Sequence, residues 1–175
     1  IQAILEDELQ SGVEKYNSTY GTGIVMDPRT GAIKAIANYP TFDPNYPGSS
    51  DEENRRNFAI SDIMEPGSTF KLVTAIAAVE QGKVSFDEIF ETPDDGMKEI
   101  QGQILRDHDP LGDMTFQEVI QKSSNIAVAE IAMRLDKEVF YQYARNLGFG
   151  TPTNIDLSGE ENGSLAKPYD WSGVS

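Results

Sequence analysis

The sequence predicts an α+β fold, because one β-hairpin is followed by a run of helices instead of alternating strands and helices. Residues 21–39 carry the hairpin pattern. Thr22, Ile24 and Met26 occupy alternate positions, an Asp-Pro-Arg-Thr-Gly turn follows, and an extended run comes after the turn. Apolar residues at helical spacing follow. They predict helices at about 68–81, 115–122, 125–135 and 137–147. A two-stranded hairpin is marginal alone, so we expect the sheet to gain strands from outside this sequence.

The hairpin is flanked by a helix and a loop. Ile1, Leu5, Leu9 and Val13 recur at helical spacing, which predicts an amphipathic helix that ends before Asn17. Residues 40–56 form a long polar loop, rich in Pro, Asn, Ser and Asp. A loop of this length is expected to lie over a functional face or to be mobile.

The later helices have start and stop signals. Pro66-Gly67 begins the helix over 68–81 and Gly82 ends it, and its apolar residues lie nearly all round, which predicts a buried helix. Thr115 and Glu118 form a capping box. We expect residues 83–112 to be irregular and the tail after Gly148 to be loop with one short strand.

Composition excludes several classes of function. The chain has 175 residues, enough for one domain with a core, and 38% of them are hydrophobic. A net charge of -15 repels phosphate backbones and anionic lipid, so no nucleic-acid partner is expected. Without cysteine there are no disulfides or thiolate metal sites. The sequence begins inside a helical pattern and stops at residues 171–175 without a terminating signal, which we interpret as a partial domain over 1–175.

The first chemical motif is Ser68-Thr69-Phe70-Lys71. A serine hydroxyl needs an adjacent base, and residues i and i+3 share one face of a helix, so Lys71 is expected beside Ser68. The helix N-terminus and burial both disfavour the ammonium and lower the pKa of Lys71 toward that of a base. Ser-x-x-Lys alone is usually structural. A second copy, Ser164 to Lys167, is followed by Pro168 in a loop and is not expected to hold helical geometry.

The second motif is Ser123-Ser124-Asn125, at the junction of two predicted helices. Ser123 is a candidate to pass a proton between Lys71 and a leaving group, and Asn125 a candidate to hold Lys71 and a peptide substrate. Helix capping by Ser and Asn is the ordinary alternative, and alone it would be preferred. The two motifs together favour catalysis.

Three segments resemble class B penicillin-binding proteins. Residues 56–71, Arg-Asn-Phe-Ala-Ile-Ser-Asp-Ile-Met-Glu-Pro-Gly-Ser-Thr-Phe-Lys, resemble the family's nucleophile segment, 23–37 its first hairpin, and 147–163 the segment after its second motif. The resemblance implies the transpeptidase fold shared by penicillin-binding proteins and serine β-lactamases, here truncated, with the hairpin and helical part present and C-terminal strands missing. Ser-x-Asn favours the division subgroup over the elongation subgroup.

The resemblance also implies a mechanism. Ser68 would attack the D-Ala-D-Ala end of a peptidoglycan stem peptide, Lys71 would take its proton, and Ser123 and Asn125 would complete the relay and hold the substrate. β-Lactams would acylate the same serine. No cofactor or metal is implied. Cell-division proteins are implied partners. The expected location is the outer face of the bacterial plasma membrane, with an N-terminal anchor absent from this sequence.

One departure and several alternatives stand. The family's third motif, Lys-Ser/Thr-Gly, does not occur here. The 175 residues are therefore expected to be inactive alone, with an unpaired edge and an uncovered apolar face on the hairpin. A serine β-lactamase, a β-lactam sensor and a noncatalytic domain of the same fold are alternatives. The sole histidine, His108, makes a Ser-His-Asp triad conceivable, but a solvated loop is the better interpretation. The acidic clusters at 51–53 and 94–95 lack the ligand spacing of a calcium loop.

Overall fold

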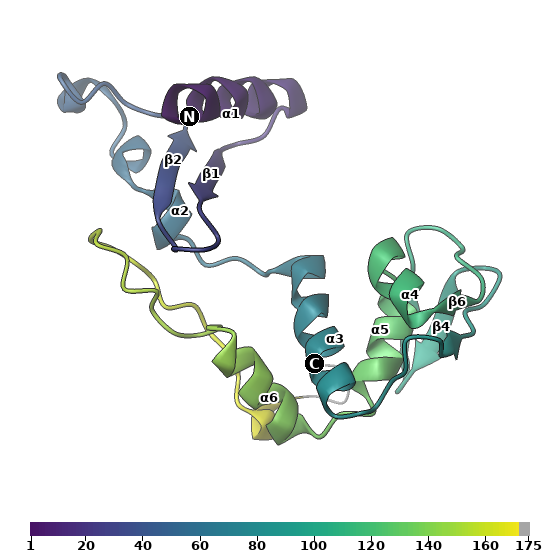
Figure 1. Cartoon of the computed structure of the whole chain (residues 1–175). Coiled ribbons are helices and arrows are strands. Elements are labelled where there is room, and N and C mark those ends of the chain that lie inside the picture. The colour runs from purple at the N-terminus through teal and green to yellow at the C-terminus, as the bar shows by residue number, and fades with distance from the viewer. Residues whose placement is uncertain (172–175) are drawn as a thin grey trace. The chain divides into compact units, whose positions relative to one another are not determined.

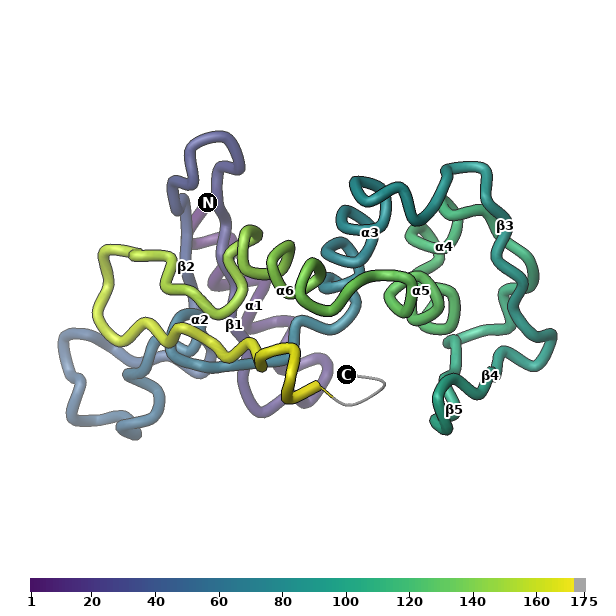
Figure 2. The backbone as a smooth tube through the Cα atoms, turned by 90° about the horizontal axis from the view of Figure 1, so that it is seen from below, coloured from purple at the N-terminus to yellow at the C-terminus, as the bar shows by residue number. Residues whose placement is uncertain are grey.

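The computed structural model describes residues 1–171. Part of the expectation about the C-terminal end concerns residues 172–175, which lie outside the described residues. The chain divides into two compact units (Figures 1 and 2). The first comprises residues 1–63 and 154–161, and the second residues 64–153 and 162–175. The first unit holds the predicted hairpin and the second holds most of the helices, which confirms the α+β prediction.

The first unit is a helix packed on a hairpin. Helix α1 spans Gln2–Tyr16 and ends at Asn17 in the left-handed conformation, as predicted. Strands β1 (Gly21–Met26) and β2 (Ile33–Tyr39) pair antiparallel. A β-carbon at Gly21 would lie 2.6 Å from Val13 Cγ2 of α1, so this close packing requires glycine. The loop after β2 carries short 3-10 turns at Pro47–Ser49 and Glu53–Arg55, and helix α2 (Phe58–Ser61) follows.

The edge and the open face of this hairpin differ in how far they are covered. At Ile36 the outer edge of β2 is bonded by the Gln2 side chain, whose amide donates to the Ile36 carbonyl (2.8 Å) and accepts from the Ile36 N–H (3.0 Å). Among the described residues no other strand pairs with this hairpin, as expected, and the Gln2 amide bonds its edge at this one position. The expected uncovered face is observed, since Ile24 and Met26 are 47% and 52% exposed.

The second unit is a helical core with small strand pairs. Its helices are α3 (Lys71–Glu80), α4 (Phe116–Lys122), α5 (Asn125–Ala132) and α6 (Lys137–Asn146). The predicted capping box is present: Thr115 Oγ1 accepts from the Glu118 N–H (3.3 Å) and Glu118 Oε2 accepts from the Thr115 N–H (2.8 Å). The core is formed by buried side chains that include Ala77, Ala78, Phe90, Met114, Val119, Ala127 and Ile131.

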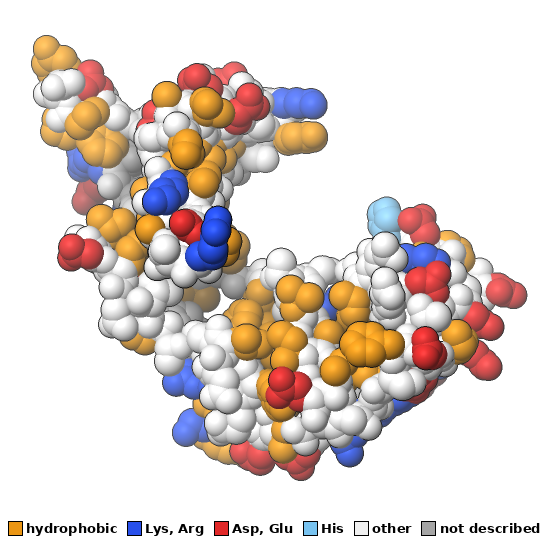
Figure 3. Space-filling model, viewed as in Figure 1, with side chains coloured by type: hydrophobic (Ala, Val, Ile, Leu, Met, Phe, Trp, Pro, Cys, Tyr) orange, Lys and Arg blue, Asp and Glu red, His pale blue; other side chains and the backbone are white. Residues whose placement is uncertain are grey.

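Helix α3 is buried on one side only. It buries Val73, Ala77 and Ala78 against the rest of the unit, but Leu72 is 55% and Ile76 39% exposed. Figure 3 shows hydrophobic side chains gathered at the surface over α3. The prediction of a buried helix is therefore wrong for one face, because apolar composition does not say which faces of a helix have neighbours. Among the described residues, no helix has both the length and the apolar character needed to cross a membrane.

The segment expected to be irregular contains strands. β3 (Ile89–Phe90) pairs with β6 (Met114–Thr115), and β4 (Met97–Ile100) forms a hairpin with β5 (Gln103–Arg106). The strand expected in the tail is absent over 148–171, where a 3-10 turn at Pro168–Asp170 occurs instead. Trp171, which follows this turn, packs against Phe140 and Tyr141 of α6.

Candidate active site

Ser68 lies on a tight turn that leads into helix α3. A 3-10 helix spans Gly67–Phe70 and continues directly into α3 at Lys71. The prediction placed Ser68 in an α-helix. The tighter turn occurs because Gly67 has φ +58°, a conformation that favours glycine, and because the Thr69 hydroxyl donates to the Pro66 carbonyl (2.6 Å). Side chains at i and i+3 eclipse in a 3-10 helix, so Ser68 and Lys71 share a side, and Ser68 is exposed.

The Lys71 amine is held by the second motif. Its Nζ donates to Ser123 Oγ at 2.9 Å, to the Ser123 carbonyl at 2.5 Å and to Asn125 Oδ1 at 2.7 Å. Three acceptors satisfy the three N–H donors of an ammonium. The structure thus brings together three of the four predicted residues through hydrogen bonds, 52 to 54 positions apart in the sequence. The described hydrogen bonds do not include one between Ser68 and Lys71.

Two opposing effects act on the charge of Lys71. Partial burial of the amine lowers the pKa of Lys71 from its usual value of 10.5, because desolvation disfavours the ammonium, and the Asp107 carboxylate raises it by a smaller amount. The net direction is downward, as expected from the sequence. A neutral amine keeps two N–H donors and gains a lone pair, which makes it a base.

The junction between α4 and α5 is built to present its oxygens. Ser123 ends α4 with φ 60° and ψ 43°, a left-handed conformation that is uncommon for a residue other than glycine. Ser124 then caps α5: its hydroxyl accepts from the Ala127 N–H (3.1 Å), and its side chain is fully buried. With only two residues between the helices, the chain reverses sharply and both Ser123 and Asn125 reach Lys71.

Sequence reasoning missed a residue that contacts this junction. Asp107 directly follows β5, and its Oδ1 accepts from the backbone N–H groups of Asn125 (2.5 Å) and Ile126 (3.2 Å). Its Oδ2 accepts from the Ser124 hydroxyl (2.8 Å). The sequence held no local signal for this contact, since Asp107 lies 17 to 19 positions before its partners and reads as part of a polar loop.

The other candidates do not form sites. Ser164 and Lys167 lie in a segment with no regular secondary structure, as expected for the second Ser-x-x-Lys copy. His108 is exposed, and no hydrogen bond to a serine is described for it. Within residues 1–171 no three or more His, Asp or Glu side chains come together as a metal site would require.

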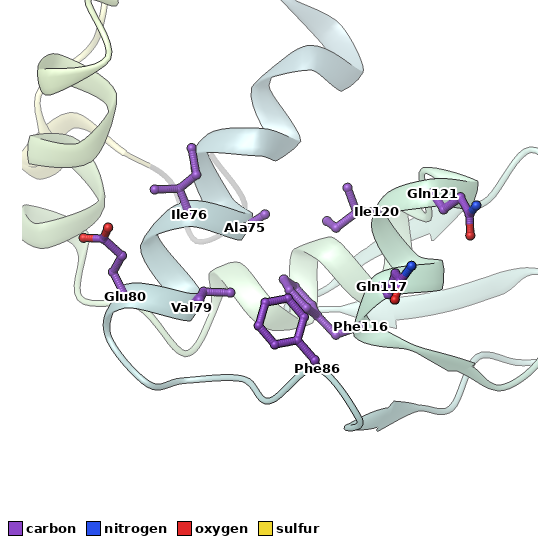
Figure 4. A pocket seen from close by; sticks show the side chains of 9 residues that line it. All are labelled: Ala75, Ile76, Val79, Glu80, Phe86, Phe116, Gln117, Ile120 and Gln121. Carbon is purple, nitrogen blue, oxygen red and sulfur yellow. The ribbon is translucent and has the colours of Figure 1, made fainter.

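A hollow of about 570 Å³ lies away from the motifs, between α3 and α4. Ile76 and Val79 of α3 and Phe116 and Ile120 of α4 line it, and Figure 4 shows Val79 pointing toward Phe86, which lies in front of Phe116. None of the four predicted site residues lines this hollow. We therefore place the candidate active site at the Lys71 cluster, where ionisable and hydrogen-bonding groups meet.

Comparisons with known proteins show the family to which the chain belongs. Residues 21–175 match the family model of the penicillin binding protein transpeptidase domain. The chain is 34% identical over 171 residues to the probable peptidoglycan D,D-transpeptidase PenA of Neisseria gonorrhoeae, which covers 98% of the chain and 29% of PenA. It is 30% identical over 174 residues to the peptidoglycan D,D-transpeptidase FtsI of Escherichia coli K12, with 99% and 29% covered. The chain thus spans less than a third of either relative.

A solved structure gives the same result at the level of the fold. The apo transpeptidase domain of penicillin-binding protein 3 from Burkholderia pseudomallei superposes with a TM-score of 0.84 at 29% identity, covering 99% of the chain and 47% of that domain. The fold predicted from the sequence is therefore confirmed, and the chain corresponds to part of that domain. On the family match and these likenesses, the chain belongs to the transpeptidase domain family of the class B penicillin-binding proteins.

Proposed function

We propose that this chain is part of a peptidoglycan D,D-transpeptidase in which Ser68 is the nucleophile, Lys71 the base, Ser123 the proton relay and Asn125 a substrate-binding residue. The observation that carries the proposal is the position of Lys71, which lies one turn after Ser68 and whose amine is bonded to both Ser123 and Asn125. The names of the relatives PenA and FtsI support the reaction class.

The chemistry proceeds in two transfers. The Ser68 oxygen attacks the carbonyl of the penultimate D-Ala while neutral Lys71 accepts the hydroxyl proton. The peptide bond then breaks, and the proton that Lys71 took up passes through the Ser123 hydroxyl to the departing D-Ala amine. An amine of a neighbouring stem peptide attacks the resulting ester, forms the cross-link and releases Ser68. A β-lactam would follow the first transfer, but its leaving amine stays attached through the opened ring.

The wider setting is also part of the proposal. A transpeptidase of this class would act at the outer face of the plasma membrane, and Ser-x-Asn in the second motif favours a role in division with division proteins as partners. A β-lactamase would need a group that activates water to hydrolyse the acyl ester, and among residues 1–171 no carboxylate is described as bonded to Ser68. A sensor would acylate without turnover, so turnover of a stem peptide separates it from the transpeptidase.

Labelling with a fluorescent penicillin tests the nucleophile. In the full-length gene product, Ser68→Ala should abolish labelling, and Lys71→Ala should slow it by about a hundredfold or more because it removes the base. Ser164→Ala is the matched control, since it alters the other Ser-x-x-Lys copy, and labelling should be unchanged. Label on the Ser68→Ala protein would refute the assignment.

The 175 residues alone are expected not to acylate. Acyl transfer needs donors for the oxyanion, and losing one donor costs about a hundredfold or more. In the family one donor is the backbone N–H of the nucleophile, here Ser68, and the other accompanies the Lys-Ser/Thr-Gly motif that this sequence lacks. Mass spectrometry after incubation with penicillin would detect an adduct on Ser68. Acylation as fast as in the full-length protein would show that the third motif is dispensable.

A further inference from the structure

The carboxylate of Asp107 bonds three consecutive residues at the start of α5. It accepts three hydrogen bonds: from the Ser124 hydroxyl (2.8 Å), the Asn125 N–H (2.5 Å) and the Ile126 N–H (3.2 Å). The carbonyl of the preceding residue, Arg106, accepts from Asn125 Nδ2 at 2.7 Å. Asn125 is thus held at its backbone and at its side chain by two consecutive residues.

These contacts determine which way the Asn125 amide faces. Because Nδ2 is engaged by the Arg106 carbonyl, the amide oxygen of Asn125 is left to accept from Lys71. The Ser124 hydroxyl is fixed in the same way, since its proton goes to Asp107 and its lone pair to the Ala127 N–H. Without the Asp107 carboxylate, the fully buried Ser124 hydroxyl would have no acceptor for its proton, which destabilises the fold.

We propose that Asp107 is the positioning residue of the site, which fixes the Ser123–Asn125 turn so that its oxygens hold the Lys71 amine. This inference rests on the proposed function, since it assigns Asp107 a role in the same reaction. Asp107 does not contact Lys71 through a described hydrogen bond and acts through the residues that do. A carboxylate suits the place, because the free N–H groups and the dipole of a helix N-terminus favour an anion.

The β4–β5 hairpin gives this carboxylate a fixed support. The Asp107 N–H donates to the Gly96 carbonyl (3.0 Å), which closes the base of the hairpin. Lys98 of β4 forms an ion pair with Glu130 of α5, so the hairpin is attached to the same helix that Asp107 caps. The hairpin thus has a function under the proposal: it holds the end of β5 against the start of α5.

Charge gives the proposal a measurable signature. Charged groups on the elements packed against α3 are Glu118 and Lys122 of α4, Glu130 of α5, and Lys137, Glu138 and Arg145 of α6. Among the described residues, Asp107 is the group whose charge raises the pKa of Lys71. Removing that charge should lower the pKa, so the acidic limb of the acylation profile should move to lower pH.

Three variants of the full-length protein test the proposal: Asp107→Asn, Asp107→Ala and Asp109→Asn. Asp107→Asn keeps the shape and one carbonyl oxygen but loses the charge. Asp107→Ala loses every contact. Asp109→Asn is the matched control, because Asp109 is an exposed acid two positions away and no described hydrogen bond links its side chain to α5. Penicillin acylation is measured as the rate constant at saturating drug and the Kd for the drug, across pH.

The expected result is a graded loss in the rate constant. Asp107→Ala should lose about a hundredfold, because misplacing a catalytic group costs on that order. Asp107→Asn should lose less, with the acidic limb at lower pH, and Asp109→Asn should match the unaltered protein. Circular dichroism verifies folding in each case, and if Asp107→Ala fails to fold, the profile of Asp107→Asn decides alone.

Two failures are distinguishable. If the unaltered protein is labelled at Ser68 and Asp107→Asn has the same rate constant and the same pH profile, the role of Asp107 is refuted and the proposed function stands. If the unaltered protein is not labelled, or is labelled elsewhere than Ser68, the proposed function itself is refuted.

Discussion

Ser123 and Ser124 are adjacent and chemically identical, yet the structure assigns them different tasks. Ser124→Ala removes the cap of α5, worth about 1 kcal/mol, and the hydrogen bond to the Asp107 carboxylate, worth about 1.5 kcal/mol. Asp107 keeps its two backbone partners, so it is not left unpaired. We therefore expect Ser124→Ala to lower the free energy of unfolding by about 2.5 kcal/mol, or about 5 to 10 °C in Tm for a chain of this size.

Ser123→Ala should behave in the opposite way. Lys71 keeps the Ser123 carbonyl and Asn125 as acceptors, so the free energy of unfolding should change by less than about 1 kcal/mol. Under the proposed function, penicillin labelling of the full-length protein should nevertheless fall, because the hydroxyl proposed as the proton relay is gone. Alanine and serine both adopt the left-handed conformation at similar cost, so the backbone gives no reason for a larger effect.

Urea unfolding followed by fluorescence measures both variants. In these 175 residues Trp171 is the single tryptophan, and it reports on the unit that contains both serines, since it packs against Phe140 and its indole N–H donates to the Ala166 carbonyl (2.9 Å). Equal midpoints for the two variants, or a lower midpoint for Ser123→Ala, would refute the division of roles.

Three further predictions concern other parts of the molecule. Only neutral Lys71 accepts a proton, and burial lowers its pKa below 10.5, so penicillin acylation of the full-length protein should rise with pH and level off below 10.5, as stopped-flow rates would show. Thr115→Ala should lower the free energy of unfolding by about 1 kcal/mol at neutral pH. The hydrogen bonds from the Thr115 backbone and hydroxyl lower the pKa of its cap partner Glu118 below 4.5. The ionised Glu118 therefore stabilises the fold above pH 4.5, and this contribution is lost as pH falls through the pKa of the folded state. Urea midpoints measured across pH would show the loss. Gly21→Ala should destabilise the first unit by about 1 to 3 kcal/mol, because the new β-carbon would overlap with α1. Gly12→Ala has open space around it and should stabilise α1 by about 1 kcal/mol. Hydrogen exchange of the α1 amides distinguishes the two variants.

The sequence predicted those elements whose signals are local. The hairpin over 21–39, the capping box at Thr115 and the helix that ends before Asn17 all depend on residues within a few positions of one another, and all are observed. The β4–β5 hairpin was missed because its turn is Gln101-Gly102. Both residues have positive φ, which is typical of a tight hairpin turn, but glutamine at the first place lacks the usual Asn-Gly or Asp-Gly signal.

The site was predicted in part for a related reason. Ser-x-x-Lys and Ser-x-Asn are short patterns, and the family resemblance assigns both to one site. Lys71, Ser123 and Asn125 could therefore be grouped from the sequence. Asp107 could not be grouped with them, because its contacts depend on how β5 ends beside α5. The exposed face of α3 was also beyond prediction, since helical periodicity shows which residues are apolar but not which elements cover them.

The resting geometry of Lys71 implies a condition for catalysis. With three acceptors on Nζ, an ammonium has every donor engaged and no lone pair, so it is inert toward the Ser68 hydroxyl. Losing one proton leaves two donors, which can keep the amine attached to the Ser123–Asn125 turn. Under the proposed function, the new lone pair is the one that accepts the Ser68 proton. Asp107 would then serve two ends at once, because the carboxylate that orders the turn also raises the fraction of Lys71 that stays charged and idle at a given pH. Under the proposal, an aspartate at this position lowers the fraction of neutral Lys71 but keeps the Ser123–Asn125 turn ordered. The pH profile of Asp107→Asn separates these two contributions.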